Sequence, residues 1–386
     1  MHILYIVGGS GKGYGSERVA AELIAELTKQ KLVSYTVITS QRGCVNRWCT
    51  QLRITNYVVP MKFYVYAKAK GRLTDTIKRA IRNMQADYTA GRAVKKIEHC
   101  VNMNTVDAIH TNLSRDLVGG MLSRKYGIPH VWHIQELYKS HYKLNLLKKN
   151  QIEWMNMHSS LFICVSDLVA AEWIEQGMDD KKVAVIKNGI NSSFIRQRED
   201  RNDEWIRIVM SGEICEAKGQ WILLQAVRLM DKDLRNKVKI DLYGGGKPAY
   251  LKIIKRNIRD WSMNDIVDMK GYDPDVTSVL YKYDLGINAS RGEAFGLSTI
   301  ECMCAGLCVL ASNTGSNPGI ITDNVDGFMF DYNNAVVDLK NKLEYIVTNK
   351  KLISELGRAA RRKVMQTYDI STMTEQVYAK YAYITK

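Results

Sequence analysis

The sequence predicts an α/β protein of two doubly wound domains, each built around a mostly parallel sheet. Apolar runs of strand length alternate with segments of helical periodicity, the pattern of a parallel sheet covered by helices on both faces. The alternation stops at residues 191–204, which are polar, charged and without a period, and then restarts. A length of 386 residues also suits two or three domains.

The first half of the chain is predicted to hold six strands and at least two helices. Ser16–Gln30 is expected to be helical because its apolar residues share one face and it begins at a serine. Arg72–Val101 is a long basic helical region. The expected strands are Ile3–Val7, Tyr35–Thr39, Val106–Thr111, Pro129–Ile134, Leu161–Val165 and Val183–Lys187.

The second half repeats the alternation. The expected strands are Ile206–Met210, Val238–Tyr243, Ile266–Met269, Leu285–Ala289 and Cys308–Ala311, and the expected helices are Lys218–Met230, Pro248–Trp261 and Leu297–Ala305. We place a first domain at residues 1–190, a linker at 191–204, a second domain at 205–365 and a C-terminal helix at 366–386 that packs back toward the first domain. The carboxyl ends of both sheets should face a central cleft, where such sheets bind ligands.

Composition excludes several classes of protein. Hydrophobic residues make up 46% and charged residues 25%, with five prolines, which argues against collagen-like, low-complexity and disulfide-scaffold proteins. We find no uncharged apolar run of about 18 residues that would span a membrane, and no basic region of a signal peptide at the N-terminus. The eight cysteines form no CxxC pair, so we expect reduced, mostly buried thiols in a cytoplasmic protein.

The net charge of +15 favours anionic partners. Residues 60–100 hold a local excess of lysine and arginine. A solvated helix face accounts for this excess, and so does docking on an anionic membrane surface, which would place the protein peripherally on the inner face of the cell membrane. No nucleic acid partner is expected because no recognised binding motif accompanies the charge.

A glycine-rich loop at residues 8–16 joins the first strand to the first helix. Glycines let backbone amides approach an oxyanion at a helix start. The GxGxxG spacing fits no register, and Gly13 follows Lys12 where the phosphate-binding P-loop has serine or threonine. The loop therefore indicates either anion binding or a tight structural turn.

Two carboxylates stand eight residues apart across an expected strand–loop–helix junction. Glu293 lies in the loop and Glu301 just over one turn into the helix. Both can face the cleft while the amides of residues 296–298 point outward at the helix start. This arrangement suits a nucleotide diphosphate on the helix amides, with carboxylates accepting from sugar hydroxyls. The alternative for Glu301 is a structural role, in which its negative charge only complements the dipole at the start of the helix.

This region resembles the C-terminal signature of family 4 glycosyltransferases, which are retaining enzymes with the GT-B fold. The matching residues are Tyr272, the run 285–296, Glu301, Ala305, Gly306 and Val309, with further matches at residues 15–18, 187–191 and 218–219. The resemblance covers most of the chain. It implies sugar transfer from a nucleotide-sugar donor, UDP- more than GDP-linked, without a metal or other cofactor.

Roles for individual residues follow from that resemblance. Glu293 would lie beside the transferred sugar and Glu301 would bind the donor ribose. Lys218 would neutralise the diphosphate, and Tyr272 would contact the base. The remaining expected contacts are Gly15 and Ser16 with the diphosphate from the first domain, and the helix start at Phe295, Gly296, Leu297 and Ser298 with phosphate.

His133 matches a first-domain histidine that family members place near the sugar, and we count it with Glu293 as a candidate catalytic residue. A structural histidine is the alternative. His130 and His133 should point to opposite faces of a strand, which argues against zinc. Glu136 would orient an acceptor hydroxyl or simply begin a helix.

One position departs from the family pattern. Glu213 stands where family members commonly have a phosphate-binding arginine. Either Glu213 turns away, or Arg291 or Lys12 compensates. Two DxD spacings, at residues 231–233 and 273–275, lie where aspartate is expected at turns or helix starts, so no metal site is predicted.

The predicted function is a retaining glycosyltransferase that acts on a glycan or lipid-linked acceptor, in surface or exopolysaccharide synthesis. The alternatives are a nucleotide-sugar epimerase of the same fold class and an inactive sugar-nucleotide-binding subunit. The sequence does not specify the sugar, the base, the acceptor, the linkage or the oligomeric state.

Overall fold

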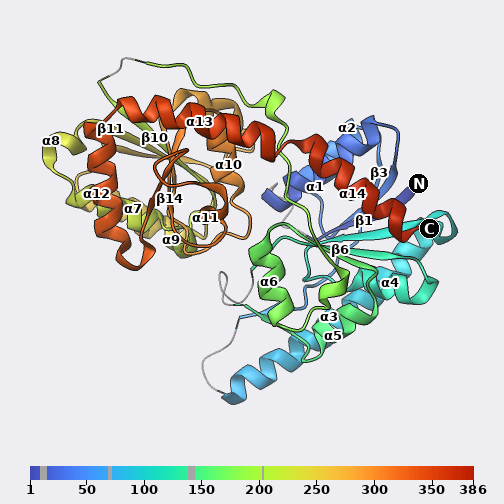
Figure 1. Cartoon of the computed structure of the whole chain (residues 1–386). Coiled ribbons are helices and arrows are strands. Elements are labelled where there is room, and N and C mark those ends of the chain that lie inside the picture. Colours follow the sequence, from blue (N-terminus) through green and yellow to red (C-terminus); the bar gives the residue numbers. More distant parts are fainter. Residues whose placement is uncertain (9–14, 68–71, 138–143, 202–203) are drawn as a thin grey trace. The chain divides into compact units, whose positions relative to one another are not determined.

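A computed structural model describes the chain except for residues 9–14, 68–71, 138–143 and 202–203 (Figure 1). The chain forms two compact units. The first contains Met1–Gly189 together with Ile370–Lys386, and the second contains Ile190–Asp369.

The first unit is built on a seven-stranded sheet in the order β3-β2-β1-β5-β6-β8-β9. Its neighbouring strands pair in parallel, with β1 between β2 and β5. The strands are β1 (His2–Val7), β2 (Ser34–Thr39), β3 (Thr55–Val58), β5 (Ala108–Asn112), β6 (His130–Ile134), β8 (Leu161–Cys164) and β9 (Val183–Val185), and a separate antiparallel pair is formed by β4 (Val65–Tyr66) and β7 (Asn145–Leu146).

The helices of the first unit connect these strands as crossovers. They are α1 (Gly15–Lys29), α2 (Cys44–Gln51), α3 (Arg72–Cys100), α4 (Val118–Tyr126), α5 (Gln151–Met157) and α6 (Asp167–Glu175). β5 and β6 are buried along their whole length, because a parallel strand with helices on both faces has no solvent-facing side. Both strands nevertheless carry buried polar side chains, namely His110, Thr111 and Asn112 on β5 and His130 and His133 on β6.

The last helix of the chain, α14 (Ile370–Ile384), also belongs to the first unit. It packs against α1 (Figure 1). Tyr381 is fully buried, and its hydroxyl lies 2.7 Å from Nδ1 of His110 on β5. A buried phenol needs such a partner, so this contact fixes the position of the terminal helix.

The second unit contains a six-stranded parallel sheet in the order β12-β11-β10-β13-β14-β15. The strands are β10 (Ile206–Ser211), β11 (Val238–Tyr243), β12 (Val267–Gly271), β13 (Leu285–Asn288), β14 (Cys308–Ser312) and β15 (Phe328–Phe330). The helices are α7 (Gln220–Leu229), α8 (Lys232–Arg235), α9 (Pro248–Asp260), α10 (Leu297–Cys304), α11 (Asn317–Ile320), α12 (Ala335–Thr348) and α13 (Lys351–Thr367). Two parallel sheets in two units confirm the predicted fold class.

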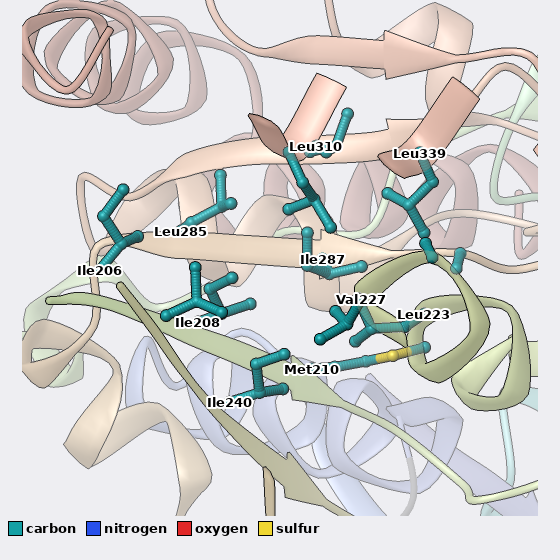
Figure 2. Close-up of a cluster of buried hydrophobic side chains, with 14 of the residues drawn as sticks. Ile206, Ile208, Met210, Leu223, Val227, Ile240, Leu285, Ile287, Leu310 and Leu339 are labelled. Carbon is teal, nitrogen blue, oxygen red and sulfur yellow. The ribbon is translucent and has the colours of Figure 1, made fainter. Parts of the chain in front are cut away.

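Aliphatic side chains from the central strands form the core of the second unit. Figure 2 shows Ile208, Ile240 and Ile287 from three strands next to Leu223 and Val227 of α7. Each is at most 4% exposed. Burying a side chain of this size stabilises the fold by about 1.5–3 kcal/mol, so this core holds the loops at the strand ends in place.

The segment that follows Gly189 is anchored to the second unit. Arg198 donates from its guanidinium to Asp284 at 3.0 Å, and its backbone amide donates to the carbonyl of Ala305 at 2.7 Å. Both the Arg198 and the Asp284 side chains are largely buried. The chain therefore passes from the first unit to the second between Gly189 and Ile190, and it returns to the first unit between Asp369 and Ile370.

Candidate functional site

The second unit brings two predicted residues, Lys218 and Glu293, into direct contact. Nζ of Lys218 donates to Oε1 of Glu293 at 2.5 Å. The hydroxyl of Ser290 donates to the same oxygen at 2.8 Å. Glu293 is only 8% exposed, whereas the Lys218 side chain keeps 21% of its surface accessible. The ammonium group is therefore held by the carboxylate at the end of a side chain that stays partly accessible.

Helix α10 begins within this site, and its start is fixed by side-chain hydrogen bonds. Gly296 has φ +86° and immediately precedes the helix. Asn288 at the end of β13 donates to Thr299 of α10 at 2.8 Å, and its Oδ1 accepts from the amide of Ser290 at 3.2 Å. The strand end and the first turn of the helix are thus tied together. A helix start oriented this way presents positive charge to an anion.

The loop that carries Glu293 is supported from a neighbouring loop. Ser316 donates from its amide to the carbonyl of Glu293 at 2.8 Å and from its hydroxyl to the carbonyl of Ala294 at 2.6 Å. Ser312 donates to the carbonyl of Ser290 at 2.7 Å. These contacts preorganise the carboxylate, which matters because a preorganised group stabilises charge in a transition state without further movement.

Helix α7 also begins at a glycine, Gly219, whose φ is +77°. A Cβ added at this position would lie 2.0 Å from the carbonyl oxygen of Ala289. The close approach places the segment Glu216–Lys218 against the end of β13, where the amide of Arg291 donates to the carbonyl of Ala217 at 2.8 Å. Gly219 therefore allows Lys218 to reach Glu293.

Gly219→Ala is expected to destabilise the protein by about 2 kcal/mol or more, because alanine is strained in this conformation and clashes with Ala289. Urea unfolding measures the change. Gly91→Ala is the matched control: Gly91 lies inside α3 with nothing near its Cβ position, so that variant should gain about 0.5–1 kcal/mol. Equal stability of the two variants would contradict the assignment.

The other predicted residues of the second unit differ in their exposure to solvent. Glu301 is buried in α10 at 4% exposure, and Phe295 is buried against the ring of Tyr368. Leu297 and Ser298 are partly exposed in the first turn of α10. Tyr272 is 42% exposed after β12.

Arg291 and Glu213 bear on the departure from the family pattern. Nη1 of Arg291 lies 3.5 Å from Oε1 of Glu216, beside the segment that carries Lys218. Glu213 is partly exposed, and its carbonyl accepts from Gln220 at 3.0 Å. Lys12, the other candidate for compensation, lies outside the described residues.

The predicted residues of the first unit lie near the carboxyl ends of its strands. Gly15 and Ser16 begin α1, and the carbonyl of Ser16 accepts from Asn112 at 3.2 Å. Asn112 in turn accepts from Gln135 at 2.6 Å. The sequence reasoning did not identify Asn112 or Gln135, although both are polar residues at the ends of predicted buried strands, which was an available signal.

His133 is fully buried on β6. Within the described part of the chain, neither of its ring nitrogens has a hydrogen-bond partner. The ring packs edge-on against His110 with centroids 5.3 Å apart. Burial lowers the pKa of His133 to about 3, so the side chain is neutral near pH 7. His130 contacts Thr111 at 2.8 Å, and burial lowers its pKa to about 3 as well.

Two acids of the first unit have well-defined surroundings. Glu136 accepts from the amide and hydroxyl of Ser114 at 2.6 and 2.8 Å, which favours a structural role. Asp116 was not identified from the sequence. Its Oδ1 accepts from the amide of Val118 at 2.8 Å, and burial, partly opposed by that amide and by Arg115, raises the pKa of its carboxyl to about 6.

Metal-binding patterns in the sequence have local explanations. Asp231 caps α8 by accepting from the amides of Asp233 and Leu234, and Asp273 accepts from the amide of Asp275 at 2.9 Å. Over the described ranges, no group of three or more His, Cys, Asp or Glu side chains is placed to hold a metal ion. Cys302, Cys304 and Cys308 are buried free thiols, as expected from their position.

Comparison with known proteins identifies the family. The family described as "Glycosyltransferase Family 4" matches residues 14–194, and the family "Glycosyl transferases group 1" matches residues 191–363. Each half of the chain thus matches a glycosyltransferase family. A solved structure of an Anabaena protein in complex with UDP and glucose has a TM-score of 0.80 at 19% identity and covers 99% of this chain and 100% of its own, which supports the fold of this glycosyltransferase.

Two curated relatives show how the similarity is distributed. A Staphylococcus aureus poly(ribitol-phosphate) α-N-acetylglucosaminyltransferase is 29% identical over 40% of this chain and 31% of its own length. An Escherichia coli galactosyltransferase named for UDP-Gal and α-D-GlcNAc-diphosphoundecaprenol is 18% identical over 92% of this chain and 93% of its own. The chain thus spans about a third of the length of the first relative.

Proposed function

We propose that this protein is a retaining glycosyltransferase that moves a sugar from a UDP-sugar to a glycan or lipid-linked acceptor in surface or exopolysaccharide synthesis. The observation that carries the proposal is the Lys218–Glu293 contact at the starts of α7 and α10. A cation, two helix starts and a buried carboxylate together suit a sugar diphosphate.

In this proposal each group has a separate task. Lys218 and the amides at the start of α10 hold the diphosphate and stabilise the charge that develops on it. The bond from the anomeric carbon to the phosphate oxygen breaks, and a bond to the acceptor hydroxyl oxygen forms on the same face. The departing phosphate takes the hydroxyl proton, so no metal and no side-chain nucleophile is needed. Glu293 positions the sugar, and His133 acts near it in its neutral form.

The printed names of similar proteins support the donor and the acceptor. The Anabaena structure contains UDP and glucose, and the Escherichia coli relative is named for a lipid diphosphate. The basic residues 60–100 suit attachment to the inner face of an anionic membrane, where a lipid-linked acceptor would lie. No described helix is both long enough and apolar enough to cross a membrane. Arg291 supplies the second cation for the diphosphate, because Glu213 stands where family members commonly have a phosphate-binding arginine.

The test is a thermal-shift panel of UDP-, GDP- and ADP-sugars, with and without EDTA. We expect the largest rise in melting temperature with a UDP-sugar, no effect of EDTA, and a smaller rise in Arg291→Ala. Product analysis by NMR should show the donor's anomeric configuration. A preference for GDP or ADP, loss of binding in EDTA, or conversion of the donor sugar without an acceptor would contradict the proposal, and the last would indicate an epimerase.

A further inference from the structure

Helix α3 has two faces that differ sharply in exposure. Its packing face consists of Ala86, Ala90, Ala93 and Ile97, each at most 1% exposed, and it lies against α4. Figure 1 shows the amino-terminal part of α3 extending beyond the sheet of its unit. This part of the helix therefore has a surface that the fold of the first unit does not cover.

Opposite the packing face, α3 carries four large apolar side chains in one line. Ile77, Ile81, Met84 and Tyr88 are 51%, 50%, 71% and 65% exposed. Their spacing of four, three and four residues places them within about 60° of one another at 100° per residue, roughly half a turn from the alanines. We call these four residues the apolar ridge. Isolated exposed apolar residues are ordinary, but an aligned set marks an interaction surface.

Cations accompany the apolar ridge. Lys78 lies beside the apolar ridge, Arg82 lies on the same side but closer to the packing face, and Lys95 continues the line of the ridge toward the end of the helix. None of these three cations has an acidic partner among the residues that the structure describes. The acids Asp87 and Glu98 lie toward the other flank. They pair with Lys148 at 2.7 Å and Lys125 at 2.6 Å. The free charge beside the ridge is therefore positive.

We propose that the apolar ridge and its flanking cations seat α3 on an anionic lipid surface. Exposed apolar side chains with adjacent lysine and arginine are the combination that places a helix in a membrane interface. Against a second copy of this chain, the same cations would meet each other and repel. A coiled-coil partner is disfavoured because the ridge extends over only about three turns. The proposal rests on the proposed function in that a lipid-linked acceptor would be reached from this surface.

The experiment measures co-sedimentation of the full-length protein with vesicles. One set contains phosphatidylcholine with 30% phosphatidylglycerol, and the other contains phosphatidylcholine alone. We expect binding to the anionic vesicles only. The double variant Ile81→Ser/Met84→Ser should bind at least tenfold more weakly. Lys78→Glu/Arg82→Glu should also lose binding, since each cation near the surface contributes about fivefold.

Matched controls separate the ridge from general effects. Leu229 and Val325 of the second unit are 54% and 57% exposed, so Leu229→Ser/Val325→Ser removes similar apolar surface and should bind like the unchanged protein. All variants alter exposed side chains, and their melting temperatures should agree closely. Equal binding to both vesicle types, no binding, or unchanged binding of the ridge variants would overturn the proposal. A dimer in light scattering that the ridge variants convert to a monomer would instead assign the ridge to a second copy.

The two proposals fail separately. UDP binding in solution uses no lipid, so it should be unchanged in the ridge variants. Vesicle binding without any UDP binding would leave the ridge proposal standing and remove the proposed function. UDP binding without vesicle binding would remove the ridge proposal and leave the proposed function standing.

Discussion

Lys218→Ala is expected to lower the rate of sugar transfer by about 10²–10³-fold, the range found when one preorganised stabilising group is removed from an active site. The variant loses the cation that would balance the diphosphate, and Glu293 keeps its negative charge without the 2.5 Å contact. The two effects act in the same direction, because the remaining carboxylate repels the donor. Both the affinity for UDP and the rate at saturating donor should fall.

Two further variants separate charge from geometry. Lys218→Arg keeps the positive charge, but the planar guanidinium group does not reproduce the single short hydrogen bond from Nζ to Glu293. We therefore expect an activity between those of Lys218→Ala and the unchanged protein. Lys232→Ala changes a lysine in α8 of the same unit and should be indistinguishable from the unchanged protein. Transfer is measured as release of UDP at several donor concentrations. Full activity and normal UDP affinity in Lys218→Ala would refute the role given to this lysine.

Glu293→Gln tests the partner of Lys218. Glutamine keeps the shape and can still accept from Ser290, while the negative charge is removed. We expect transfer to fall by at least 10²-fold while UDP affinity stays the same or increases, since a repelling charge near the diphosphate is lost. A variant with full transfer activity would favour a binding subunit or another catalytic group.

The regular elements were predictable because their signals are local. Apolar runs located every strand of the two parallel sheets except β3 and β15. The helices at Ser16 and Leu297 began within one residue of their predicted starts. The short strands β3, β4, β7 and β15 and the short helix α2 were not predicted. Such elements have too few residues for a period to be visible, and they depend on contacts made after folding.

The site was predictable only in part for a related reason. The spacing of Glu293 and Glu301 is local and identified a loop followed by a helix. The contact of Glu293 with Lys218 joins residues 75 positions apart, so only the family resemblance pointed to it. Asp116 carries no local pattern beyond that of a residue near a helix start, and its burial follows from the packing around it. The return of the C-terminal helix to the first domain was expected from the sequence. The contact that anchors α14, between Tyr381 and His110, joins residues 271 positions apart and was not expected.

Acidification from pH 7 to pH 5 is expected to destabilise the first unit through its buried histidines. Burial lowers the pKa values of His130 and His133 to about 3, while in the unfolded chain they are about 6.5. Below pH 6.5 the unfolded chain therefore takes up protons that the folded chain excludes, and stability is lost as pH falls toward 3. At pH 5 each histidine accounts for about 2 kcal/mol. Asp116 acts in the opposite direction below about pH 6, because its pKa is raised.

His133→Leu isolates one of these contributions. Leucine has nearly the volume of histidine, and His133 makes no side-chain hydrogen bond in the described part of the structure that would be lost. The difference in unfolding free energy between pH 7 and pH 5, measured by urea titration, should shrink by about 2 kcal/mol. His99→Leu on the exposed surface of α3 should leave that difference unchanged. If His133→Leu lost as much unfolding free energy between pH 7 and pH 5 as the unchanged protein, His133 would not be neutral in the folded protein at pH 5.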